Sequence, residues 1–150
     1  MRSIRMSKEA IGFLILTTLL SLAFVVSIVY AASSSGSWKG VNYTVSVWNL
    51  VYRSDYQALY SSHSAFLNNL VGGVTACITY TLEGPDSSHI ATNTLYPSGP
   101  DFYDSRQMYV DVSDLAPNTY SMEAETRVQL FEGNDSYQDT ANITGSFTKE

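Results

Sequence analysis

The chain has few charged side chains and almost no cysteine or histidine. Only 15% of its 150 residues are Asp, Glu, Lys or Arg, against about 25% in an average soluble domain. A single Cys excludes a fold held together by several disulfides. With two His and one Cys, a zinc site of three nitrogen and sulfur ligands would need all three residues, and their spacing does not suggest one.

The charges that are present divide the chain in two. Residues 1–31 carry a net charge of +2, whereas residues 32–150 carry five basic and thirteen acidic side chains, a net of −8. An acidic domain without a cluster of Lys or Arg lacks the basic surface that nucleic acids require. We therefore expect no nucleic-acid partner.

Sequence motifs of common enzymes are absent. The chain has no Gly-x-Ser-x-Gly elbow, no His-Glu-x-x-His and no glycine-rich phosphate loop. The run Asp86-Ser87-Ser88-His89 contains the residue types of a catalytic triad, but triads are assembled from distant segments. We expect no enzymatic activity and no cofactor.

The amino-terminal segment predicts export. A short basic region, residues 1–12, precedes the uncharged run Phe13–Ala32, and Val29-Tyr30-Ala31 fits a secretory cleavage site, so residues 1–31 are predicted to be a signal peptide. The run is also long enough to span a bilayer, which leaves a retained membrane or filament-core helix as the alternative. In either case the rest of the chain faces outward, so the protein is extracellular or on the cell surface. It contacts the membrane only through this segment, if uncleaved.

A third way of processing this segment is suggested by Lys8-Glu9-Ala10-Ile11-Gly12 followed by Phe13-Leu14-Ile15-Leu16. This stretch resembles the junction cut in type IV prepilins, where the apolar helix after the Gly is kept as the filament core. Bacterial members carry a Glu five residues after the cut, where this chain has Thr17. Archaeal-type pilins, which often lack that Glu and carry a β-rich outer domain, are more similar. The resemblance implies a pilin-like filament subunit cut before Phe13.

The remainder is predicted to be a flexible arm, residues 32–40, and one β-rich domain, residues 41–150. Apolar and polar side chains alternate with a period of two, which is typical of half-buried strands, in three stretches: Val41–Asn49, Val74–Leu82 and Tyr120–Phe131. Shorter strand candidates are His89–Tyr96 and Met108–Val112. Asp139–Thr148 is the predicted hairpin partner of Tyr120–Phe131.

One stretch interrupts the strand pattern. The apolar residues between Tyr56 and Leu70 fall at helical spacing, with Ser54 and Gly72-Gly73 as candidate caps. This spacing predicts one short helix at about residues 55–70. The alternative is an extended segment with a turn at Ser61–Ser64.

A six-residue motif points to a fold class. Leu115-Ala116-Pro117-Asn118-Thr119-Tyr120 resembles the turn of fibronectin-type and other immunoglobulin-like domains, in which the Tyr packs at the corner and bonds back to the backbone. Together with about six antiparallel strands, this resemblance implies an all-β protein. We expect a single immunoglobulin-like antiparallel β-sandwich of a secreted surface or filament subunit.

Two kinds of candidate modification or metal site are visible. Three Asn-x-Ser/Thr sequons would accept glycans on an exported chain; their asparagines are Asn42, Asn134 and Asn142. Four aspartates in or near predicted loops are weak calcium candidates, namely Asp101, Asp104, Asp111 and Asp114. A solvated acidic rim is the simpler interpretation of these aspartates, and no metal is expected otherwise.

These observations together favour an exported, non-enzymatic structural or adhesive protein that assembles with copies of itself. Assembly could use strand exchange, with Val41, Tyr43, Val45 and Val47 as the apolar positions of the exchanged strand. The alternative is a secreted carbohydrate-binding module whose exposed rings stack on sugars, with Trp48, Tyr96 and Tyr103 as candidates.

Overall fold

The computed structural model describes residues 31–70 and 72–150, so the predictions for residues 1–30 lie outside the described residues. The described part contains eight strands and no helix of the length and apolarity needed to cross a membrane. The strands are β1 (Ala31–Trp38), β2 (Val41–Arg53), β3 (Ala58–Asn68), β4 (Thr75–Glu83), β5 (Ile90–Leu95), β6 (Asp101–Asp111), β7 (Asn118–Glu132) and β8 (Asp135–Lys149).

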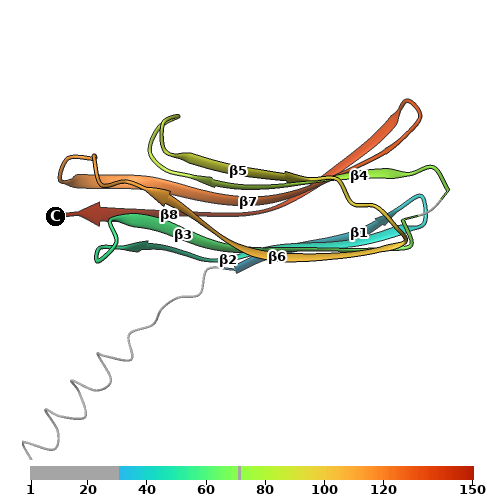
Figure 1. The fold of residues 1–150 in the computed structure, drawn as a ribbon, viewed down its shortest axis with the longest axis horizontal. Helices are drawn as coiled ribbons and strands as arrows, with labels where there is room; N and C mark the ends of the chain where they lie inside the picture. Colours follow the sequence, from blue (N-terminus) through green and yellow to red (C-terminus); the bar gives the residue numbers. More distant parts are fainter. Residues whose placement is uncertain (1–30, 71) are drawn as a thin grey trace, which may run out of the picture.

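The strands form two four-stranded antiparallel sheets that pack face to face (Figure 1). Sheet A has the order β1-β2-β3-β6 and sheet B the order β5-β4-β7-β8. The edge strand β1 contacts β8 of the opposite sheet, and the edge strand β6 contacts β5. The predicted all-β sandwich is confirmed.

Alternation of side chains builds the core. Along β2, β4 and β7 every second side chain is buried between the sheets, and the residues between them face outward. These are the inward faces that the period-two pattern predicts. Burying a Val, Leu or Ile side chain contributes about 1.5–3 kcal/mol. The side chains with no exposed surface include Val41, Val45, Val47, Leu59, Leu67, Ile78, Leu82, Val128 and Leu130.

The helix predicted at about residues 55–70 is wrong. Residues 54–57 form a turn, and β3 follows with Leu59, His63 and Leu67 buried at even spacing. Leu59 and Leu67 fit a period of two as well as a helical period, and β3 pairs along its length with β2 and β6. Pairing on both sides therefore overrides the local helical spacing, which the many Ser and Asn residues support poorly.

Residues 32–40, predicted to be a flexible arm, form most of a strand and the turn after it. Residues 31–38 form β1, and each of them is paired with a residue of β2. Lys39 and Gly40 connect the two strands, both with positive φ (48° and 84°). This is the two-residue turn whose twist suits a β-hairpin.

A β-bulge shifts the register inside β2. Trp48 is opposite Ser62 and Val51 is opposite Tyr60, so Asn49 and Leu50 together face a single residue of β3. Asn49 has a φ of 57°, a conformation that Asn tolerates better than most residues. Because of the bulge, Leu50 points into the core and Val51 points outward.

A polar network crosses the centre of the core. His63 has no exposed surface; its Nε2 lies 2.7 Å from Ser61 Oγ and its Nδ1 2.9 Å from Thr126 Oγ1. Thr126 Oγ1 donates its proton to the carbonyl oxygen of Ser46 at 2.9 Å. The threonine oxygen therefore accepts from Nδ1–H, and Nε2 accepts from the serine hydroxyl. Neutral His63 thus links β3 of sheet A to β7 of sheet B, and burial lowers its pKa to about 4.

The His63 network predicts a loss of stability in mild acid. The unfolded chain binds a proton at His63 near pH 6.5, before the folded chain does, so stability falls as the pH drops from about 6.5 towards 4. The wild type should lose about 2 kcal/mol between pH 7 and pH 4.5 from this group. Urea unfolding of wild type and His63→Gln at both pH values measures the effect. Equal losses in both proteins would contradict it.

Candidate functional site

The outer face of sheet A consists of the side chains of β1, β2, β3 and β6 that point away from sheet B. A row of four serines crosses this face from one edge to the other; cross-strand pairing places Ser33, Ser46, Ser64 and Ser105 side by side. The hydroxyls of Ser46 and Ser33 are 3.0 Å apart. The row therefore presents only small hydroxyl side chains.

Aromatic side chains lie on both sides of the serine row. Phe66 is opposite Tyr103 and Tyr60 is opposite Tyr109. Tyr103 is 70% exposed and Tyr109 67% exposed, which is unusual for such large rings. The ring centroids of Tyr60 and Tyr109 are 6.2 Å apart. Exposed aromatic surface of this kind is typical of interaction faces.

The outer face of sheet A is uncharged except at its ends. Its charged side chains are Arg53, at the end of β2, and Asp101 and Asp111, at the two ends of β6. The interior of the face therefore presents only hydroxyls, amides, aromatic rings and aliphatic groups.

A shallow cleft opens on this face beside the bulge in β2. Its volume is about 310 Å³. The guanidinium carbon of Arg53 lies 5.8 Å from the centroid of the Tyr60 ring. The cleft is lined by Asn49, Val51, Arg53, Tyr60, Ser61, Ser62 and Gln107.

The three predicted sugar-stacking residues do not form one platform. Trp48 and Tyr103 lie on the outer face of sheet A, in different cross-strand rows. Tyr96 follows β5 of sheet B and is therefore separate from both. The cleft beside Tyr60 was not predicted, because the sequence does not reveal the bulge that creates it.

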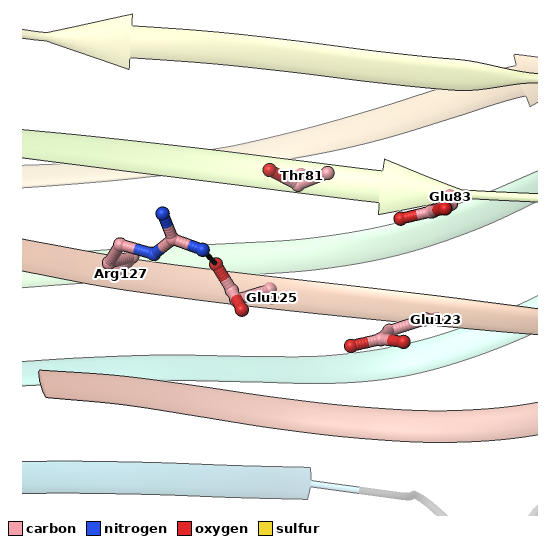
Figure 2. A pocket seen from close by; sticks show the side chains of 5 residues that line it. All are labelled: Thr81, Glu83, Glu123, Glu125 and Arg127. Carbon is pink, nitrogen blue, oxygen red and sulfur yellow. Dashed lines mark ion pairs between the residues drawn. The ribbon is translucent and has the colours of Figure 1, made fainter. Parts of the chain in front are cut away.

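The outer face of sheet B is different because charges lie at its centre. Figure 2 shows a hollow between β4 and β7, in which Arg127 and Glu125 form an ion pair of 2.7 Å. Glu123 lies in the same hollow (Figure 2) and accepts a 2.5 Å hydrogen bond from the amide of Asn142. The hollow is small, about 110 Å³, and these partners already use part of its polar surface.

Arg106 bridges one open side of the sandwich, between β6 and β5. Arg106 points inward from β6 and donates two hydrogen bonds to Asp104, at 2.7 and 2.8 Å, and one to Asn93 of β5 at 2.7 Å. Its guanidinium holds the pKa of the Asp104 carboxyl below its usual value. The guanidinium also lies 5.3 Å from the centroid of the Tyr80 ring, and burial raises the pKa of the Tyr80 hydroxyl.

Hydrogen bonds from hydroxyl groups to a carboxylate bridge the other open side of the sandwich, between β1 and β8. Asp139 of β8 accepts hydrogen bonds from Ser34 of β1 at 2.5 Å and from Tyr43 of β2 at 2.7 Å. A Cβ atom on Gly36 would collide with the hydroxyl of Tyr43. Only glycine at this position lets β1 lie against Tyr43.

The predicted strand-exchange residues lie in a central strand. Val41, Tyr43, Val45 and Val47 are buried side chains of β2, which pairs with β1 on one side and with β3 on the other. Removing β2 would break two ladders and open the core. The edge strand that borders β2 is β1, none of whose side chains is fully buried.

The four predicted calcium ligands are not brought together. Asp101 and Asp111 lie at opposite ends of β6, about 33 Å apart at 3.3 Å per residue, and Asp104 binds Arg106. Within residues 31–70 and 72–150, no three His, Cys, Asp or Glu side chains are placed to hold a metal ion. The aspartates are spread along a strand because β6 is longer than the sequence pattern indicated.

The three sequon asparagines are all exposed. Asn42 and Asn142 point outward from β2 and β8, and Asn134 lies in the turn between β7 and β8. Each is accessible to a glycosylating enzyme, although the Asn142 amide must first release Glu123.

The fourth Asp of the calcium prediction belongs to a different arrangement. His89 is buried, with Nδ1 2.7 Å from Asp86 and Nε2 2.9 Å from Asp114. The carboxylates of Asp114 and Asp86 raise the pKa of His89, and the Ser88 hydroxyl together with His89 lowers the pKa of Asp86 to about 2. Ser88 lies 3.1 Å from Nδ1, but both ring nitrogens face carboxylates. The imidazolium therefore has no free lone pair with which to accept the serine proton.

The chain was compared with known proteins. No protein-family model matches it, and no curated protein matches it either. The fold and the surfaces above are therefore the basis for the functional argument.

The contacts of His89 with Asp86 and Asp114 predict that stability depends on pH in the opposite direction to that predicted for His63. Because the folded pKa of His89 is raised, its contribution to stability is complete below about pH 6.5 and is lost as the pH rises through the folded value. His89→Gln should therefore destabilise the protein more at about pH 5.5 than at about pH 9. Urea unfolding at both pH values measures the difference, with Asp55→Asn as an exposed control. An equal loss of stability at both pH values would contradict a stabilising role of these contacts.

Proposed function

We propose that the protein is an exported, non-enzymatic structural or adhesive subunit that assembles with copies of itself at the cell surface. The observation that carries the proposal is the outer face of sheet A, which carries exposed aromatic rings and is uncharged except at its ends. Charged residues are depleted at the centres of protein interfaces, and aromatic residues are enriched there.

The distribution of charge supports assembly through this face. The chain has a net charge of −6, which makes copies repel one another on average. On the outer face of sheet A, two copies can meet without placing like charges opposite each other. The serine row and the tyrosine hydroxyls can exchange hydrogen bonds with water for hydrogen bonds with a neighbour.

The immunoglobulin-like type of sandwich is part of the proposal. Tyr120, at the start of β7, donates a 2.8 Å hydrogen bond from its hydroxyl to the carbonyl oxygen of Ala116. The tyrosine corner of immunoglobulin-like domains contains a bond of this kind, so the bond supports the proposal. Chain crossings from β3 to β4, from β5 to β6 and from β6 to β7 connect the two sheets, as expected for such a fold. Sandwiches of this type are common in cell-surface proteins.

Self-assembly is tested by the molecular mass of the exported full chain. Light scattering from low to high micromolar concentration should give masses above that of one chain. Phe66→Lys, which places a charge on the outer face of sheet A, should lower these masses, because burying an unpaired charge is costly. The matched control is Phe131→Lys on sheet B, since the two rings are similarly exposed, at 41% and 37%. Single chains at every concentration of the wild type would contradict the proposal.

A second candidate function is carbohydrate binding, favoured by the cleft beside Tyr60. The cleft combines an aromatic ring and Val51 with the polar side chains of Asn49, Ser62 and Gln107. Pyranose rings present an apolar face and a rim of hydroxyls, so such a mixture of groups suits them.

Carbohydrate binding is tested on an array of neutral and uronate-containing oligosaccharides. Gln107→Ala should weaken any binding about fivefold or more, because a hydrogen bond contributes about 1 kcal/mol or more. Gln129→Ala, on sheet B, serves as the control. No binding by the wild type, or equal binding by both variants, would exclude this site.

A further inference from the structure

Four strands lie at the edges of the two sheets, and three of them carry features that discourage pairing with another chain. In β6, Asp104 and Arg106 point inward, and in β8 Asp139 does the same. The third, β5, has only six residues. Inward-pointing charges and short edge strands are the devices by which β-proteins avoid edge-to-edge association.

The fourth edge, β1, carries none of these features. Its eight residues, Ala-Ala-Ser-Ser-Ser-Gly-Ser-Trp, include no charge and no proline, and its pairing with β2 is free of bulges. The nearest lysine, Lys39, is held by Glu132 and Asp135. Lys39 is therefore not free to place its charge at this edge, where it would discourage pairing with another chain. On alternate residues of β1, the backbone N–H and C=O groups point away from β2, and no other strand of residues 31–70 and 72–150 pairs with them.

We propose that β1 is a second contact between copies: the β1 strands of two chains pair antiparallel and join their A sheets into one continuous sheet of eight strands. This inference rests on the proposed function and adds an edge-to-edge contact to the contact through the outer face of sheet A. The partner is a second copy of this chain, because β1 fits itself: it is uncharged, and its side chains up to Ser37 are all Ala, Ser or Gly. Like strands can therefore approach without a steric or electrostatic penalty.

The geometry of a sheet restricts how the two copies meet. Residues directly opposite each other must lie on the same face. In β1, Ser33 and Ser35 point to the outer face, and Ser34 and Gly36 point towards sheet B. A twofold axis perpendicular to the sheet therefore lies between the two copies of one residue, and the axes that keep most of β1 paired lie at Ser34 or at Ser35. In the first register Ser33 is opposite Ser35 of the other copy, and in the second Ser35 is opposite its own counterpart.

The registers suggest a variant that tests both. Ser33→Lys combined with Ser35→Lys places two lysines opposite each other in either register. Like charges directly opposite each other destabilise a strand pair. The matched control is Thr92→Lys combined with Thr94→Lys. These residues are exposed on β5, an edge strand of sheet B, so this variant leaves the outer face of sheet A and the β1 edge unchanged. Both double variants change the net charge equally.

The experiment compares the wild type and both variants as full exported chains by sedimentation velocity, with thermal melting to show that all three are folded. The β1 variant should associate at least tenfold more weakly than the wild type, and the β5 variant should associate within about twofold of it. Equal association of the two variants, whether weakened or not, would overturn pairing through β1 and leave self-assembly standing. If the wild type does not associate at all, self-assembly itself fails.

Discussion

The structure depends on the burial of alternate side chains between two antiparallel sheets. One face of each long strand packs in the core and the other faces solvent, so the outward-pointing side chains are not needed for core packing. The fully buried residues of β2, β4 and β7 are almost all aliphatic. The outward-pointing residues between these buried ones therefore determine the chemistry of the surface.

Polar groups inside the sandwich fix how the two sheets lie on each other. At the centre, His63 and Thr126 join the sheets through hydrogen bonds. At the sides, Arg106 bonds to Asn93 across one opening and Asp139 bonds to Ser34 across the other. Aliphatic packing alone is non-directional, whereas each of these bonds requires a defined position. The edge strand β1 is held in place by such polar contacts, without a fully buried side chain of its own.

Much of the fold could be predicted from the sequence because alternation is a local property. The strands around Val45, Ile78 and Val128 were predicted with their inward faces, and so was the hairpin between β7 and β8. β3 was misread because Leu59 and Leu67 satisfy both a helical and a strand period. β1 was missed because a run of Ala, Ser and Gly shows no apolar alternation, and only its pairing with β2 defines it as a strand.

The candidate site was less predictable, because cross-strand register depends on several strands and cannot be read from one segment of the sequence. The serine row uses one residue from each of four strands, and the pairing of Arg106 with Asn93 joins segments from opposite sheets. Trp48 and Tyr103, two of the sugar-stacking candidates, point away from the core. Sequence reasoning could not foresee that Tyr96 belongs to the other sheet or that a bulge opens a cleft beside Tyr60.

The proposed pairing of copies through the free edge of β1 is tested by hydrogen exchange of the backbone amides of residues 31–38. Exchange is compared in dilute and in concentrated solutions of the full chain. If the claim is right, the outward-pointing amides of β1 become protected as the chain associates, while the exposed amides of the β6 edge do not change. Association without any change in the exchange of β1 would contradict it.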